Sequence, residues 1–447
     1  MGESTKVKAK EGNRGRLLRL MSQSLATKLI MLTVRLLRNA ILARVLGPVE
    51  RGAFALIMTL PEMISTMGNM GASSSVAYYA SQREPRLPAI GGFITLICFA
   101  GGGALGLIAY GVITSQWFSA NYGVMILSFV GVITVMVPLY LFRINSQSFF
   151  VARDSIGKAN VLRLTESLGP LVLFLVFWLV LDIAPLLAAV YAWLISFVLI
   201  LIAAISWYKK EGALPPRFHL PTFKAMISYG ARGHFDALFQ TMLLRIDFLF
   251  IGAMLGSEEL GYYAMASAAA ELLLMFPEAI AFPLMSRLMR SHEQPRDKLT
   301  PLALRFIFTS MLCAAVMLAI VGDWLIILLF GRDYLPAYEP MLLLLPGLIC
   351  LSICGVLRLD LLGRNKPGLV SIIAGMAVLM NLLLNWTLIP LWGNAGAAVS
   401  SSISYFFAAS LLHTLYTRYS GVSPLHTLLV RKSDIETILS IVKPASR

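Results

Sequence analysis

Two arginines, Arg35 and Arg38, lie near the middle of an apolar stretch that runs from Leu25 to Gly52. About 20 apolar residues cross a bilayer core roughly 30 Å thick, so both charges are expected close to mid-depth. Each such charge costs roughly 2.5 to 3.5 kcal/mol on insertion scales. Residues three apart share one helix face. The pair therefore predicts an inward-facing polar cavity that holds an anion or an opposing acid.

A second charged helix is predicted at residues 224–255. One side of it carries Arg232, Asp236, Gln240 and Asp247, and a neighbouring side carries His234, Thr241 and Arg245. This helix would begin the second half of the chain, as the helix with Arg35 begins the first. The simplest geometry places the polar faces of both helices in a cleft between the halves, near the membrane midplane.

The alternative is that these charges pair with one another and only stabilise the fold. Arg232 can reach Asp236 one turn away, and Arg245 can reach Asp247 or an outer acid. Arg35 and Arg38 have no acid on their own helix, so their partners must come from elsewhere. The candidate acids are Glu62, Glu166, Glu271, Glu278 and Asp360.

The composition requires a membrane environment. Of the 447 residues, 58% are hydrophobic and only 13% are charged, and the mean hydropathy is +0.77. The apolar residues form long blocks, which predict membrane helices and exclude a transmembrane β-barrel. The net charge of +14 resides mainly between these blocks, where basic residues orient helices, so nucleic-acid binding is not expected.

Twelve blocks predict twelve membrane-spanning helices, an all-α polytopic protein with two six-helix bundles around a central cavity. They lie at 25–46, 53–80, 89–114, 122–144, 160–181, 185–207, 224–255, 260–286, 302–330, 337–362, 368–390 and 395–417. Alternate connections are rich in Lys and Arg, and the intervening connections have almost none. This alternation predicts an even number of crossings with both termini in the cytoplasm.

The predicted domains follow from these spans. They are a basic N-terminal segment at 1–24, a six-helix bundle at 25–207, a linker at 208–223, a second six-helix bundle at 224–418 and an amphipathic tail at 419–447. The basic segment and the tail are both expected at the inner membrane surface.

The two predicted bundles share a repeat at their first outer turn. The stretch LGPVERGAFA at 46–55 aligns with LGSEELGYYA at 255–264, and at the same offset Glu62 aligns with Glu271. Two such halves that enter the membrane from the same side would be related by an axis along the membrane normal.

The remaining sequence motifs indicate neither an enzyme active site nor a metal site. The glycine pattern that begins at Gly101 resembles a dinucleotide fingerprint, but it lacks a preceding strand and is better explained by close helix packing. The five histidines have no ligand spacing, and the four cysteines all lie inside apolar blocks. We expect neither a metal nor a cofactor, although Na⁺ or H⁺ could drive transport.

Three stretches resemble the polysaccharide-export flippases, which include the O-antigen flippases of the multidrug, oligosaccharidyl-lipid and polysaccharide (MOP) exporter superfamily. They read ARVLGPVERGAF at 43–54, LLRIDFLFIGAMLGSEELGYYAMA at 243–266, and GRNKPGLVSII with NLLLNWTLIPLWGNAGAAVSSSISY within 363–405. The resemblance implies two bundles around a V-shaped cavity that opens alternately to each side. It also implies a cargo, a polyprenyl-pyrophosphate-linked oligosaccharide that moves from the cytoplasmic to the outer leaflet.

A basic cavity suits this cargo because arginine matches phosphate geometry bidentately. The predicted diphosphate-binding residues are Arg35, Arg38, Arg232 and Arg245. The predicted cavity or coupling residues are Asn39, Glu62, His234, Asp236, Gln240, Asp247 and Glu271.

The expected location is the bacterial cytoplasmic (inner) membrane. The expected partners are the lipid-linked glycan, the lipid bilayer and other membrane proteins of polysaccharide assembly. A cation-coupled multidrug exporter of the same superfamily is the first alternative, although acids should dominate its cavity. A polysaccharide polymerase or ligase would need a sizeable outer loop, and the outer connections here are short. A nonspecific lipid scramblase or a structural membrane protein is a further alternative.

Overall fold

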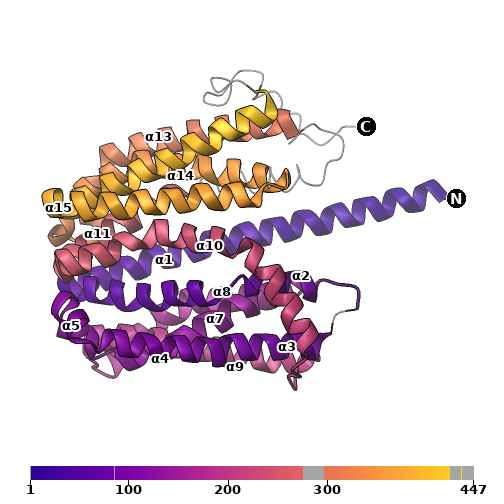
Figure 1. Ribbon diagram of the computed structural model, residues 1–447, viewed down its shortest axis with the longest axis horizontal. Helices are drawn as coiled ribbons and strands as arrows, with labels where there is room; N and C mark the ends of the chain where they lie inside the picture. The colour runs from indigo at the N-terminus through magenta and orange to yellow at the C-terminus, as the bar shows by residue number, and fades with distance from the viewer. Residues whose placement is uncertain (1, 85, 275–295, 423–433, 435–447) are drawn as a thin grey trace.

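The structure is a computed structural model that describes residues 2–84, 86–274, 296–422 and 434; the side chains at 2–29, 32, 124, 232 and 296–299 are outside this description. All regular structure in the described residues is helical. Figure 1 shows two groups of long helices, one formed by α2 to α9 and the other by α11 to α15, with α1 running between them. The prediction of an all-α protein in two bundles is confirmed.

Helix α1 (Gly2–Gly68) is two helices joined by a sharp reversal. Gly47 has φ 67° and ψ 174°, a conformation that only glycine adopts without strain, and Pro48 starts the second arm. The first arm is already helical at Gly2, and Figure 1 shows its N-terminal end projecting beyond the other helices. Helix α15 (Pro367–Ser420) reverses in the same way at Gly393. After each reversal, the second arm runs back toward the end of the molecule at which the first arm begins.

The remaining helices follow the predicted blocks. Their bounds are α2 (Ala72–Ala80), α3 (Leu87–Thr95), α4 (Gly102–Ile113), α5 (Gln116–Tyr122), α6 (Val124–Leu127), α7 (Val130–Ala152), α8 (Ile156–Leu175), α9 (Pro185–Lys210), α10 (Leu220–Met254), α11 (Ser257–Ala270), α13 (Arg296–Phe330) and α14 (Tyr338–Gly363). A short 3₁₀ turn, Glu271–Leu274, continues α11. In the described chain, eight helices are long and apolar enough to cross a membrane. The number twelve stays a prediction.

Helix α10 belongs to both bundles. Its first turns pack into the apolar interior of the N-terminal bundle, where Met226 is fully buried with Phe149 and Phe150. A Cβ added at Gly71 of the N-terminal bundle would lie 2.0 Å from the carbonyl oxygen of Gly230, so the two backbones are in direct contact. The rest of α10 packs against α15 of the C-terminal bundle. The predicted bundle boundary at residue 224 therefore does not separate two independent packing units, because α10 packs against both bundles.

The duplicated turns meet each other. A Cβ added at Gly52 would lie 1.7 Å from the carbonyl oxygen of Ser257, and one added at Gly261 would lie 2.0 Å from that of Pro48. Gly52 aligns with Gly261 and Pro48 with Ser257, so the two contacts are the same contact seen from each half. The repeat predicted from the sequence is thus matched by a reciprocal contact, as an approximate two-fold axis between the halves requires.

Candidate functional site

A pocket of about 650 Å³ lies between the two halves. It is lined by helices of the N-terminal bundle on one side and by α10, α11 and the turn after α11 on the other. The side chains that face it are mostly charged, polar or aromatic. The charged ones are Arg35, Arg38, Arg51, Arg163, Arg245, Glu62, Glu166 and Glu271. Five arginines against three glutamates leave an excess of positive charge.

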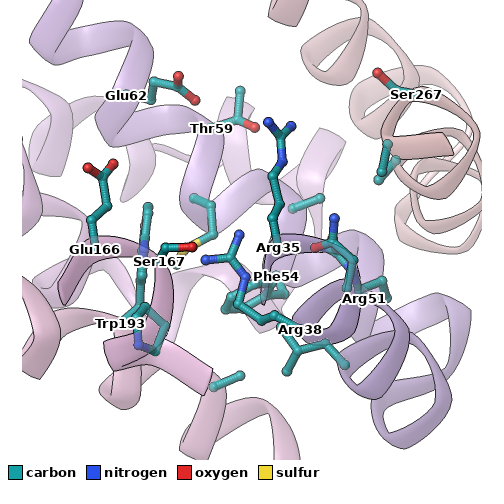
Figure 2. Close-up of a pocket in the computed structure, with 18 of the residues that line it drawn as sticks. Arg35, Arg38, Arg51, Phe54, Thr59, Glu62, Glu166, Ser167, Trp193 and Ser267 are labelled. Carbon is teal, nitrogen blue, oxygen red and sulfur yellow. The ribbon is translucent and has the colours of Figure 1, made fainter. Parts of the chain in front are cut away.

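Helix α1 supplies half of the charged and polar side chains of the pocket, because both of its arms line it. Arg35, Arg38 and Asn39 come from the first arm, and the reversal at Gly47 returns Arg51 to the same pocket on the second arm. Figure 2 shows Arg35 and Arg38 projecting into the space between the helices, with Glu166 and Ser167 on the facing helix. Two of the four predicted diphosphate-binding residues are therefore adjacent in the pocket.

Four charges form one ion-pair network. Glu271 accepts from Arg35 at 2.8 Å through Oε2 and from Arg245 at 2.8 Å through Oε1. Arg245 Nε also lies 3.7 Å from Glu62 Oε2. Ser267 donates a further hydrogen bond to Glu271 at 3.1 Å. The network joins the halves, because Arg35 and Glu62 come from α1 whereas Arg245 and Glu271 come from the C-terminal half.

The other three pocket arginines are different. Within the described residues, no acid pairs with Arg38, Arg51 or Arg163, and no acceptor hydrogen-bonds to them. Arg51 is only 7% exposed, and its buried Nε has no partner in the described chain. Its guanidinium lies 5.5 Å from the ring centre of Phe54. An unpaired guanidinium is costly where it is buried, as in Arg51, whereas Arg38 and Arg163 are half-buried. All three have donors to offer an anion that enters the pocket.

Arg51 and Arg163 were missed as site residues by sequence reasoning. Arg51 lies in the duplicated turn, which a linear sequence places at the membrane surface. Only the sharp reversal at Gly47 brings it back toward Arg38, and the pair Gly47-Pro48 was the available signal. Arg163 lies shortly after a basic connection, where a positive charge is expected for orientation alone.

Three predicted residues of α10 lie outside this pocket. Asp236 pairs with Arg358 of α14 at 3.6 Å. Gln240 lies near Arg358 and Tyr405 at a very small separate cavity of about 10 Å³. His234 contacts the ring of Phe235. The side chain of Arg232 lies outside the described residues, so its predicted role stays a prediction.

Asp247 lies in a buried polar cluster of the C-terminal half. It is 3% exposed and accepts hydrogen bonds from Tyr263 and, at 3.0 Å, from Ser401. Asn381 donates to Ser401 at 3.3 Å, and Asn385 donates to Asn381 at 3.0 Å. Asp247 does not line the arginine pocket, and its predicted coupling role stays a prediction.

The acids proposed as partners have distinct contacts. Glu62 and Glu271 belong to the pocket network, as described above. Glu166 accepts from Arg143 at 3.0 Å and from Gln147 at 3.2 Å. Asp360 accepts from Arg364 at 2.6 Å and from Thr300 at 2.9 Å. Glu278 lies outside the described residues. No group of three His, Cys, Asp or Glu side chains in the described chain could hold a metal ion.

Comparison with known sequences identifies the family. Residues 41–339, well over half of the chain, match the profile of the polysaccharide biosynthesis protein family. The chain belongs to this family. The resemblance noted in the turn and helix motifs is therefore confirmed at the family level.

Two relatives of this polysaccharide biosynthesis protein have curated names. A probable low-salt glycan biosynthesis flippase of Haloferax volcanii is 28% identical over 177 residues, which are 38% of this chain and 37% of the relative. A putative O-antigen transporter of Shigella flexneri is 25% identical over 216 residues, which are 46% of this chain and 50% of the relative. The matched stretches thus span half or less of these relatives.

Solved structures establish the fold of this family member. The lipid II flippase MurJ in an inward closed conformation superposes with a TM-score of 0.74 at 14% identity, over 96% of this chain and 94% of that one. An inward-facing MATE multidrug resistance transporter of the MOP superfamily superposes with a TM-score of 0.64 at 14% identity, over 87% of this chain and 94% of that one. At such low identity the similarity concerns the fold alone, which is that of MOP transporters.

Proposed function

We propose that this protein is a flippase that moves a polyprenyl-pyrophosphate-linked oligosaccharide from the cytoplasmic to the outer leaflet by alternating access. The observation that carries the proposal is the trio Arg38, Arg51 and Arg163, which face the pocket between the halves without an acid of their own. The named relatives, a glycan biosynthesis flippase and an O-antigen transporter, support the same class of cargo.

The chemistry of the pocket fits a diphosphate. A diphosphate carries two or more negative charges, and each guanidinium can donate two parallel hydrogen bonds to phosphate oxygens. Such charge-assisted bonds are stronger than neutral ones, and they would compensate the buried guanidinium of Arg51. The polyprenyl tail remains in the lipid, and no covalent bond forms or breaks. The site therefore needs neither a nucleophile nor a cofactor.

The same geometry disfavours the alternatives. A pocket for organic cations would be dominated by acids, whereas arginines outnumber glutamates here. In addition, two of the three pocket glutamates are already engaged by pocket arginines. We place the protein in the bacterial cytoplasmic membrane with both termini in the cytoplasm. In support, the start of α1 and the end of α15 lie at the same end of the helices in Figure 1.

The decisive experiment removes the unpaired arginines in cells that lack the natural copy. Arg38→Ala and Arg51→Ala should each reduce surface glycan about tenfold or more, because each removes charge-assisted hydrogen bonds of roughly 1.5 to 3 kcal/mol. The lipid-linked saccharide should accumulate on the cytoplasmic leaflet, which extraction and mass spectrometry would identify.

Arg332→Ala is the matched control, because Arg332 is an exposed arginine outside the pocket. It should leave glycan export unchanged. Membrane levels of every variant are measured by immunoblotting. Normal surface glycan in the double variant R38A/R51A, at normal protein level, would overturn the proposed diphosphate site.

A further inference from the structure

Glu271 binds two arginines at once in the middle of the pocket. Its Oε2 lies 2.8 Å from Arg35 and its Oε1 lies 2.8 Å from Arg245. The Glu271 side chain is 12% exposed, and Ser267 of α11 donates to it from the preceding turn. Both oxygens of this carboxylate are therefore committed, and its one negative charge is shared between two potential phosphate ligands.

This arrangement copies what a bound anion would do. A bidentate carboxylate between two guanidinium groups occupies the same donor positions as two phosphate oxygens. Of the five pocket arginines, Arg35 and Arg245 are paired through Glu271, and the other three are unpaired in the described chain. An incoming diphosphate can engage the unpaired trio first and reach the remaining two only by competing with Glu271.

The contact that would be lost is one that joins the halves. Arg35 lies on the first arm of α1, whereas Glu271 follows α11 in the C-terminal half. If a diphosphate binds Arg35, Glu271 loses this partner and lies close to a new negative charge. Arg245 would still compensate part of the Glu271 charge, but the lost partner and the added negative charge make this arrangement unfavourable, so the Glu271 side and the loaded arginine side are driven apart.

On the basis of the proposed function, we propose that Glu271 is a built-in counter-ion that the cargo's diphosphate displaces, and that this displacement breaks the ion pair between the halves. Glu271 thus links loading of the pocket to movement of the halves. Part of the diphosphate's binding free energy is used to separate Arg35 from Glu271. Cargo affinity is lower than the arginines alone would give, and an empty pocket stays closed.

The test uses the purified full-length protein and inorganic pyrophosphate, which carries the relevant charge without tail or sugar. Wild type should bind pyrophosphate, as measured by calorimetry. Glu271→Gln should bind it about tenfold tighter, a change of about 1.4 kcal/mol, because the competing charge is gone. Glu271→Asp keeps the charge and should stay close to wild type.

Glu62→Gln is the matched control. Glu62 occupies the aligned position of the first half and, among the described arginines, forms an ion pair only with Arg245, at 3.7 Å. Its replacement by glutamine removes the same charge as Glu271→Gln. A general electrostatic effect would change the affinity equally in both glutamine variants. The proposal expects a clearly larger change at Glu271, whose pairing is closer and involves two arginines.

Movement is measured with spin labels at Gln82→Cys and Gly368→Cys, one in each half, after replacement of the native cysteines. Pyrophosphate should shift the distance distribution in wild type, and Glu271→Gln without pyrophosphate should already show the shifted distribution. The proposal is overturned if wild type binds pyrophosphate but Glu271→Gln binds no tighter than Glu62→Gln, or if its unloaded distribution matches unloaded wild type. Absence of pyrophosphate binding by wild type would instead overturn the proposed function, and this inference with it.

Discussion

Whether an arginine of this pocket can bind a ligand depends on the acids beside it more than on its depth in the membrane. Arg35 and Arg38 are both predicted diphosphate ligands, yet among the described residues only Arg35 of the two forms an ion pair, with an acid 236 positions away in the chain. Arg38, three residues later on the same helix, has no described acid partner. Two residues that are equivalent in sequence therefore differ in what they can offer a ligand.

The close approach at Gly261 gives a prediction at the residue scale. A Cβ at this position would lie 2.0 Å from the carbonyl oxygen of Pro48, which is backbone and cannot move aside cheaply. Gly261→Ala should therefore destabilise the protein by about 1 to 3 kcal/mol, as overpacking does. Thermal unfolding of the purified protein in detergent would show a lower midpoint.

Gly111→Ala is the control for that substitution. Gly111 lies inside α4, and nothing lies within 4 Å of an added Cβ there, so the change should be neutral or stabilising by up to about 1 kcal/mol. Equal midpoints for the two alanine variants would contradict the close contact between the duplicated turns.

Only part of the candidate site is predictable from the sequence, for a physical reason. The cost of burying charge in an apolar stretch singled out Arg35 and Arg38, and it is a property that the sequence displays directly. Arg51 and Arg163 sit in stretches where basic residues are ordinary, so nothing local distinguished them. Their place in the pocket depends on the fold, which turns Arg51 back at Gly47 and brings Arg163 of α8 to the same pocket.

At the scale of helices, hydropathy located the elements but not their neighbours. The long apolar block at 224–255 is indeed helical within α10, yet its first turns pack against the N-terminal bundle through the buried Met226 and beside Gly71. Both ends of α10 are apolar enough to be buried, so the pattern alone does not say against which bundle each end packs. The polar residues of α10 are likewise divided, since Arg245 lines the pocket whereas Asp236 pairs with Arg358 of α14.

A clasp outside the spans joins α8 to the end of α9. Glu211 follows α9 and accepts from Lys158 of α8 and from Ser155 at 3.3 Å, and Arg153 lies 3.9 Å away. The hydrogen bond from Lys158 is the main cause that lowers the pKa of Glu211 below its usual value. The clasp therefore stabilises the fold fully above the unfolded pKa of about 4.3, and its contribution is lost as the pH falls through the lower folded pKa.

Glu211→Gln should accordingly lower the midpoint temperature of unfolding near neutral pH. This midpoint should also decrease less than that of wild type between about pH 5 and about pH 3. Unfolding midpoints of the purified protein across this range provide the measurement. Glu84→Gln, at an exposed glutamate in the loop before α3, serves as the control and should leave the profile unchanged. A Glu211→Gln profile parallel to wild type would contradict the clasp.

At the scale of the whole molecule, the repeat was the strongest structural prediction. Each aligned glycine contacts the opposite turn across the interface between the halves, and both aligned acids approach Arg245. The sequence could not show that they touch, because an internal repeat is equally compatible with halves that stand apart. Contact required complementary backbones, which the two glycines provide.

The proposed transport cycle requires the contact between the duplicated turns to open. A double variant Pro48→Cys and Ser257→Cys, in a background without the native cysteines, places thiols on both sides of it. A short thiol-reactive cross-linker should then stop export of surface glycan almost completely, and each single variant treated in the same way should remain active. Undiminished export after full cross-linking, verified by mass spectrometry, would show that this contact is static.

The reciprocal contact of Gly52 and Gly261 also has a consequence for ancestry. It is the kind of self-complementary interface by which two identical subunits form a dimer. In such a dimer every charge would occur twice around the axis. Here Arg245 aligns with Leu36, and Arg38 aligns with Asp247. A single chain that holds both repeats is free of this constraint, so one aligned position can carry a cation in the first half and a carboxylate in the second, as Arg38 and Asp247 do.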